Sequence, residues 1–174
     1  MAIEPNDSSS TIQNPKTNTE TLTVTHPSAI AENTRQLLVN NLKAFYQKSG
    51  KLQPEQLDAI YTQDVEFRDP LHTIFGILAL KSYMKNLYTS SPDIRFEYTD
   101  EQSGDNWAAI TWLMHFRHPS LAGGRLISVR GITQIRFTDR IFYHEDFYDL
   151  GAMLYQHVPV LGRIIRFINR RIGN

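Results

Sequence analysis

The fold is organised around the sequence VEFRDPLHTIFG at residues 65–76. The apolar and charged residues up to Arg68 are typical of a β-strand. Pro70 ends this strand, because proline cannot donate to a sheet ladder and it pushes the preceding residue into an extended conformation. Asp69 is therefore expected at a strand exit with a restricted backbone, and a helical pattern begins after Gly76. An acid held at such a junction can face a cavity instead of bulk water.

Length and composition narrow the class of protein. A chain of 174 residues suits one domain with a real core. The 18 Lys and Arg residues balance 18 Asp and Glu residues, which argues against general nucleic-acid binding. The chain has no Cys, so disulfides, thiolate metal sites and a Cys nucleophile are excluded, and we expect a cytoplasmic location. We also expect no signal peptide, and no apolar run reaches the roughly 18 residues of a membrane helix.

Helical spacing of apolar residues predicts three helices in the first half of the chain. The first is expected from Ala31 to Gly50. The second begins at Pro54, which is well tolerated in a first helical turn. The third follows Gly76 and is stopped by Pro92.

Beyond Pro92 the pattern changes to the period of two that is typical of strands. Strands are predicted at residues 94–98, 107–117, 126–137 and 141–148, joined by connections of hairpin length. Three helices followed by a run of strands predict an α+β fold, with helices packed on one face of an antiparallel sheet.

The two ends of the chain differ from its middle. Residues 1–30 are rich in Ser, Thr, Asn and Pro and are predicted to be a disordered tail, and residues 31–157 form the predicted domain. Residues 158–174 are predicted to be a basic amphipathic helix. Its apolar stripe and its arginines are Leu161, Ile164, Ile165, Ile168, Ile172, and Arg163, Arg166, Arg170, Arg171. This helix either lies on a membrane surface or packs on its own domain or on a protein partner.

The layout of residues 34–157 resembles the nuclear transport factor 2-like superfamily, and in particular its SnoaL-like branch of polyketide cyclases and related ketosteroid isomerases. The resemblance is carried by residues 65–70 followed by Gly76, Leu80 and Tyr83, and by the last strand with its sequence HEDFYD at residues 144–149. It implies a cone of sheet and helices, also described as a cystatin-like roll, with a pocket in its mouth. Such domains are often dimeric through the outer sheet face, so a homodimer is expected. Many members of the superfamily are not enzymes.

Asp69 matches the position at which ketosteroid isomerases keep their general base. A carboxylate in an apolar pocket can take and return protons near neutral pH, because desolvation disfavours its charged form. The alternative is a turn-forming Asp whose side chain binds the local backbone, as an Asp-Pro pair favours.

The last strand offers a second set of polar residues. Alternation places His144, Asp146 and Tyr148 on one face, and the resemblance implies that this face points into the cone. These three side chains could act as base, acid and hydrogen-bond donor. They could equally form a satisfied polar ladder at the sheet rim or a dimer contact.

Other positions distinguish this chain from named members of the superfamily. Thr133 stands where the isomerases place a second, protonated acid, so steroid isomerisation is disfavoured. Tyr46 is the candidate for their helix-borne tyrosine. Arg130 lies on the face opposite Thr133 by alternation, which argues against the Asp-Arg-Asp arrangement of epoxide hydrolases.

The remaining candidates are apolar. Trp112 shares a strand face with Met114 and Phe116, although the pattern leaves open which face of that strand lines the cone. Phe75, Tyr83 and Tyr148 would add to an apolar pocket suited to a small hydrophobic molecule. The histidines are scattered, so neither a metal nor a cofactor is inferred.

The sequence thus leaves two functions open. One is a cofactor-independent cyclase, isomerase or hydrolase that uses Asp69, Asp146 and His144 for acid/base catalysis on a small hydrophobic substrate. The other is a non-catalytic ligand-binding or protein-interaction module with the same fold.

Overall fold

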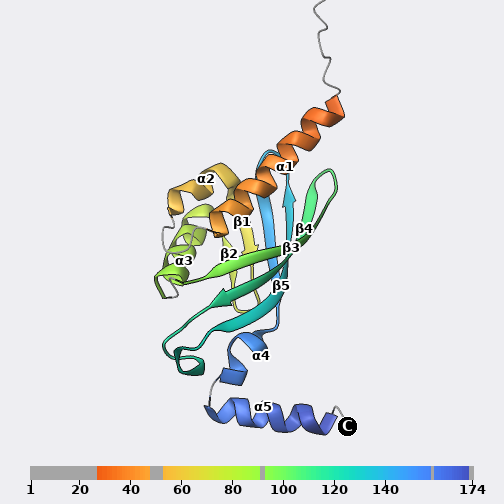
Figure 1. The fold of residues 1–174 in the computed structure, drawn as a ribbon. Coiled ribbons are helices and arrows are strands. Elements are labelled where there is room, and N and C mark those ends of the chain that lie inside the picture. The colour runs from red at the N-terminus through yellow and green to blue at the C-terminus, as the bar shows by residue number, and fades with distance from the viewer. Residues whose placement is uncertain (1–26, 48–52, 91–92, 158, 173–174) are drawn as a thin grey trace, which may run out of the picture.

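The computed structural model describes residues 27–47, 53–90, 93–157 and 159–172. Helices and strands alternate along the first half and strands dominate the second (Figure 1). The helices are α1 (Pro27–Tyr46), α2 (Leu57–Ile60), α3 (Ile77–Ser90), α4 (Leu150–Met153) and α5 (Pro159–Ile172), with short 3₁₀ turns at Pro54–Gln56, Ala122–Gly124 and Tyr155–His157. The strands are β1 (Tyr61–Arg68), β2 (Thr73–Phe75), β3 (Arg95–Ser103), β4 (Trp107–Phe116), β5 (Ile127–Phe137) and β6 (Ile141–Tyr148).

Over the described ranges, the strands form one curved sheet of six in the order β2-β1-β6-β5-β4-β3. Strands β3 to β6 pair antiparallel in chain order, as their short connections require. Strand β1 pairs parallel with β6, so the sheet is mixed and not wholly antiparallel. The α+β class is confirmed. The parallel pair was not predicted, because no hairpin joins β1 to β6 and the local pattern therefore does not encode their direction.

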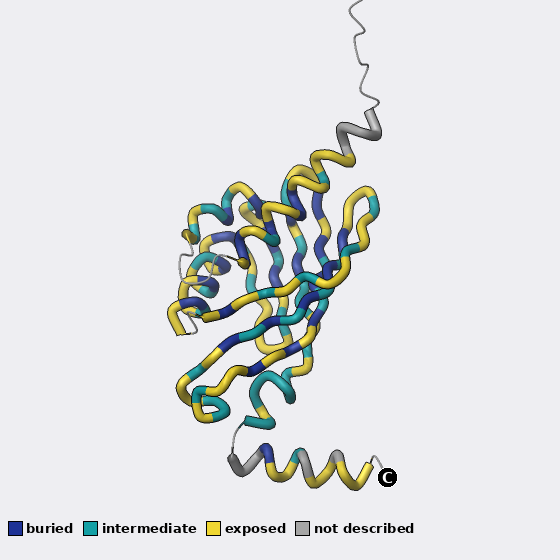
Figure 2. The backbone as a smooth tube through the Cα atoms, viewed as in Figure 1, coloured by how far each residue is buried: buried dark blue, intermediate teal, exposed yellow. Residues whose placement is uncertain are grey.

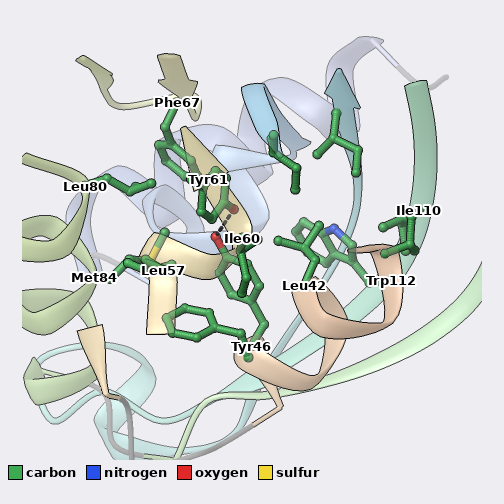
Figure 3. Close-up of a cluster of buried hydrophobic side chains, with 14 of the residues drawn as sticks. Leu42, Tyr46, Leu57, Ile60, Tyr61, Phe67, Leu80, Met84, Ile110 and Trp112 are labelled. Atoms are coloured by element: carbon green, nitrogen blue, oxygen red, sulfur yellow. Dashed lines mark hydrogen bonds between the residues drawn. The ribbon is translucent and has the colours of Figure 1, made fainter. Parts of the chain in front are cut away.

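Helices α1, α2 and α3 pack against the sheet and close the core (Figure 1). Buried and exposed residues alternate along the long strands, and the helices bury one stripe each (Figure 2). Figure 3 shows how side chains from α1, α2, α3, β1 and β4 meet in this core. Burial of one stripe per element is the general reason that such amphipathic patterns fold into two layers.

Element boundaries differ from the prediction at four places. Helix α1 begins at Pro27, inside the predicted tail, and the rest of that tail lies outside the described residues. The second helix is shorter than predicted, because the chain becomes extended at Tyr61 and enters β1 there. Strand β2 is an addition, and β3 extends as far as Ser103. None of the described helices is long and apolar enough to cross a membrane.

The turn after β1 fixes the position of Asp69. The backbone N–H of Asp69 donates to His72 O at 2.9 Å, which closes a tight hairpin between β1 and β2. Gly76 then has a φ of +83°, a left-handed conformation that favours glycine, and its N–H donates to Val65 O at 2.8 Å. This contact sets the start of α3 beside the strand that carries Asp69.

Candidate functional site

A mostly apolar cavity opens between the helices and the inner face of the sheet. It contains about 610 Å³ of space between atoms, a volume that includes open solvent at its mouth. Its walls come from α1, α3, α4 and strands β1, β3, β4 and β6. Two carboxylates, Asp69 and Asp146, stand among these apolar walls.

Asp69 is almost fully engaged by its own turn. Its Oδ1 accepts the backbone N–H groups of Leu71 and His72, both at 2.7 Å. Its Oδ2 accepts the hydroxyl of Tyr83 from α3. The side chain is only 3% exposed. Asp69 therefore joins the β1–β2 turn to α3, which is the structural role that the Asp-Pro pair also predicted.

Asp146 is held through one of its two oxygens. Thr133 lies directly opposite it on β5 and donates its hydroxyl to Oδ1 at 2.5 Å. The indole N–H of Trp112 donates to that same Thr133 hydroxyl at 2.9 Å. Because an indole N–H can only donate, the hydroxyl hydrogen of Thr133 is directed to Asp146.

Room for the indole of Trp112 is provided by Gly131, its cross-strand neighbour on β5. A Cβ at Gly131 would lie 2.2 Å from the ring atom Cη2 of Trp112, closer than packed atoms approach. Glycine is therefore required for the ring to lie over β5 and reach Thr133.

His144 supplies the second donor to Asp146. Its ring is buried, with Nε2 3.0 Å from Asp146 Oδ1 and Nδ1 2.8 Å from the Tyr61 hydroxyl. An ionised carboxylate only accepts, so Nε2 carries the hydrogen, and in a neutral ring Nδ1 accepts from Tyr61. The Tyr46 hydroxyl lies 3.2 Å from that of Tyr61 and continues the chain. Two directed hydrogen-bond chains thus converge on Oδ1 of Asp146.

Oδ2 of Asp146 is the less constrained oxygen. No hydrogen bond to it is found within the residues that the structure describes, and the side chain is 18% exposed at the cavity wall. The hydroxyl of Tyr148, two residues further along the same face of β6, likewise has no hydrogen bond in the described part of the chain. The cavity therefore contains one available acceptor and one available donor on a single strand.

Burial keeps the phenols of this region protonated. Desolvation is the largest cause that raises the pKa of Tyr61 and of Tyr46 well above its ordinary value. Desolvation also raises the pKa of Tyr148, with smaller contributions from the charges of Asp69 and Asp146. These hydroxyls are consequently hydrogen-bond donors at neutral pH.

The structure brings most of the predicted site residues together. Asp69, Asp146, Tyr46, Trp112 and Tyr148 line the cavity. The face of β4 left open by the sequence is settled, since Trp112 lies inward with Met114 and Phe116. His144 and Thr133 lie behind Asp146, against a smaller adjoining space that Tyr46, Trp112 and Asp146 share.

Two side chains considered in the sequence analysis, Phe75 and Arg130, lie on the outer surface of the sheet. Phe75 does not line the cavity, because β2 is an edge strand on which this ring is 67% exposed. Arg130 is exposed on the outer face of β5, opposite to Thr133 as alternation predicted. No guanidinium therefore joins the two carboxylates from that position.

The sequence did not identify Tyr61 as the partner of His144. Its contact depends on the parallel pairing of β1 with β6, for which no local signal exists. Met153 of α4 also lines the cavity and was missed, because a four-residue helix carries no readable period. Over the described residues, no group of three or more His, Asp or Glu side chains is arranged to hold a metal ion.

The cone-shaped mixed sheet, its three covering helices and the cavity in its mouth define the nuclear transport factor 2-like fold. Solved structures agree over most of their length. A protein from Catenulispora acidiphila with a ketosteroid isomerase-like fold, in complex with trimethylamine, matches with a TM-score of 0.60 at 15% identity, covering 69% of this chain and 91% of that one. A protein of Jannaschia sp. whose name assigns it to the SnoaL-like polyketide cyclases matches with a TM-score of 0.59 at 12% identity, covering 68% and 89%.

A third structure, an NTF2-like protein of unknown function from Burkholderia pseudomallei, matches with a TM-score of 0.59 at 16% identity over 70% of this chain and 94% of that one. At these identities the likeness shows the fold alone. The SnoaL-like domain family matches residues 42–144, and the chain belongs to that family. No curated protein matches the sequence.

Proposed function

We propose that this protein catalyses proton transfer on a small hydrophobic carbonyl compound, with Asp146 as the general base. The observation that carries the proposal is the asymmetry of its carboxylate: Oδ1 is held by Thr133 and His144, while Oδ2 has no hydrogen bond among the described residues and the side chain faces an apolar cavity. A base must be positioned and still have a free lone pair, and this arrangement meets both needs.

The chemistry is abstraction of a proton next to a carbonyl group. Oδ2 of Asp146 takes the proton, and the electron pair of the broken C–H bond moves onto the carbonyl oxygen. The hydroxyl of Tyr148 donates to that oxygen as it becomes negative. Asp146 then returns the proton to a different atom or to the same one. This scheme accounts for an isomerase or a cyclase, and it uses only side chains of this chain.

His144 and Thr133 are positioning residues in this proposal. Their hydrogen bonds to Oδ1 fix the carboxylate plane and direct Oδ2 away from the buried network. Asp69 is the weaker candidate for the base in this proposal, because both of its oxygens already accept hydrogen bonds, from Leu71, His72 and Tyr83.

The second function that the observations favour is ligand binding without catalysis. The cavity walls are mainly apolar, and most polar groups around it are paired with one another. Such a cavity can bind a hydrophobic molecule without chemistry, and the experiment below separates the two functions.

The proposal is tested by hydrogen–deuterium exchange of small apolar ketones and 1,3-diketones in D₂O, followed by proton NMR. The full-length protein should exchange the proton next to the carbonyl of at least one compound. Asp146→Asn should lower that rate by at least about 100-fold, as general bases typically contribute 10²–10⁴-fold. Tyr148→Phe should lower it less. Asp64→Asn is the matched control, because Asp64 is exposed on β1, and it should retain the parental rate.

Binding is measured in parallel through the intrinsic tryptophan fluorescence, to which the cavity residue Trp112 contributes together with Trp107. Exchange that survives in Asp146→Asn within about threefold overturns the assignment of the base. Compounds that bind but never exchange overturn catalysis on this substrate class and support the binding function.

A further inference from the structure

Helix α5 carries a row of large apolar side chains that the described part of the chain leaves about half exposed or more. Ile164, Phe167, Ile168 and Ile172 are between 46% and 79% exposed. Residues three and four positions apart lie on one side of a helix, so these four side chains form a single apolar face. Isolated exposed apolar residues are ordinary, but a continuous face on one helix indicates a binding surface.

Helix α5 is attached to the domain near its first turns. Gly162 is buried and Ile165 half-buried, and the helix contacts the 3₁₀ turn at Tyr155–His157. Figures 1 and 2 show α5 at the end of the molecule away from α1, extending beyond the sheet with mostly exposed residues. The apolar face is therefore presented outward from the domain.

The C-terminal segment that contains α5 is basic, whereas the rest of the chain has an excess of acidic residues. Residues 159–174 contain four of the 18 basic side chains and none of the 18 acidic ones, so the remaining chain has 14 basic against 18 acidic residues. Arg163 and Arg170 are seven positions apart and exposed, four positions before and three after Phe167, so they border the apolar face along its Phe167 edge. The guanidinium of Arg171 lies over the ring of Phe167, 5.2 Å from its centroid. A long cationic side chain that covers apolar surface can extend its charge past that surface.

We propose that α5 binds the surface of an anionic phospholipid bilayer, with its axis in the plane of the membrane. The apolar face inserts at the boundary between headgroups and acyl chains, and the arginines bind lipid phosphates. A helix of 14 residues is about 21 Å long, which is too short to span a bilayer and long enough to lie along it. A second copy of the chain is a poorer occupant, because two such helices in contact would bring their arginines together with no acidic residue on either helix.

Membrane binding by α5 would also bring the cavity close to the bilayer. Met153 of α4 lines the cavity, and α4 precedes α5 by a few residues, so the bilayer would lie near that end of the domain. Hydrophobic compounds concentrate in membranes, and the cavity would then draw them from the lipid phase. This last step rests on the proposed function, whereas membrane binding by α5 does not.

The test is co-sedimentation of the full-length protein with vesicles of phosphatidylcholine alone or with 30% phosphatidylglycerol, in 20 mM and 500 mM NaCl. The parent should bind the anionic vesicles in low salt, at least tenfold more weakly in high salt, and weakly to neutral vesicles. Phe167→Ser and the pair Arg163→Gln with Arg170→Gln should each weaken binding at least tenfold. The matched controls are Phe142→Ser and Arg130→Gln, both on exposed positions of the sheet, and these should bind within twofold of the parent.

Three results would overturn the proposal. The first is no binding to anionic vesicles in low salt. The second is equal binding to both kinds of vesicle, which removes the role of the arginines. The third is an oligomer in size-exclusion chromatography that Phe167→Ser dissolves, without any vesicle binding, which would assign the face to a second copy. Circular dichroism of each variant verifies that it is folded, and none of these readouts depends on catalysis.

Discussion

Two carboxylates share one cavity, yet their surroundings differ in kind. Asp69 is bound by the backbone of its own turn and by one tyrosine, and both of its oxygens accept hydrogen bonds. Among the described residues, Asp146 is bound only by side chains, Thr133 on the neighbouring strand β5 and His144 on its own strand β6, and both contact Oδ1. The comparison shows that lining a cavity does not make an acid available for chemistry. Availability depends on which lone pairs remain free.

The largest expected effect is the loss of stability in Asp69→Ala. This change removes the carboxylate that accepts from the backbone N–H groups of Leu71 and His72 and from the half-buried Tyr83 hydroxyl. Unfolding in urea should show a loss of about 2–3 kcal/mol, since a hydrogen bond to a charged group is worth about 1.5–3 kcal/mol and the exposed N–H groups of the turn can bind water instead. Asp64→Ala, on an exposed position of the same strand, should change stability by less than about 0.5 kcal/mol. If Asp69→Ala lowers the free energy of unfolding by less than about 1 kcal/mol, the role of Asp69 is not mainly structural and it becomes a candidate for the general base.

The second-largest expected effect is a loss of stability at alkaline pH, caused by the buried tyrosine Tyr61 in the hydrogen-bond network behind Asp146. Burial raises the pKa of Tyr61, so above about pH 10 the unfolded chain releases this proton while the folded chain retains it. The folded state then binds more protons than the unfolded state, and stability falls as pH rises, by about 1.4 kcal/mol per pH unit for one tyrosine. Below about pH 10 this contribution is fully present.

Tyr61→Phe should therefore make the alkaline decline of unfolding free energy shallower by about 1.4 kcal/mol per pH unit between about pH 10.5 and 11.5. Urea unfolding at several pH values measures this slope. Tyr155→Phe is the control, because that side chain is 40% exposed, and its slope should equal that of the parent. Equal slopes in Tyr61→Phe and the parent would show that the Tyr61–His144 contact opens to water.

The smallest effect on stability should come from Asp146→Asn. The amide oxygen can still accept from Thr133 and His144, and the new NH₂ group replaces the oxygen that had no hydrogen bond among the described residues. Urea unfolding at pH 7 should change by less than about 1 kcal/mol. A loss as large as that of Asp69→Ala would make both acids structural and remove the distinction between them.

The sequence predicted the elements of this fold better than their assembly. Period-two patterns identified β4, β5 and β6 to within a residue or two, and Asp69 was placed correctly at the exit of β1. Alternation grouped His144, Asp146 and Tyr148 on one face of β6, and the resemblance to the superfamily implied that this face points inward. By contrast, the Tyr61–His144 contact depends on a parallel pairing that joins distant segments, which periodicity cannot specify.

The choice between the two acids was also beyond the sequence. Both readings of Asp69, as a pocket acid and as a turn acid, were open, and the structure shows that it is both in the cavity and bound by its turn. Among the described residues, Oδ2 of Asp146 has no hydrogen bond because its two donors, Thr133 of β5 and His144 of β6, both bind Oδ1, and Trp112 of β4 donates to Thr133. Phe75 was misplaced because it pairs with Glu66 of β1 on the outer face of the sheet, whereas its neighbour Ile74 pairs with the buried Phe67.

The parallel pairing of β1 with β6 has a consequence for how the protein is made. Phe67 and His144 are cross-strand partners, although helix α3 and strands β3, β4 and β5 lie between them in the chain. The ribosome synthesises β1 early and β6 near the end. The edge of β1 that pairs with β6 therefore stays unpaired until almost the whole domain has been synthesised. Contacts between such distant segments form slowly. A ligand for this cavity would accordingly recognise only completed chains, and nascent chains would depend on protection of the unpaired edge of β1.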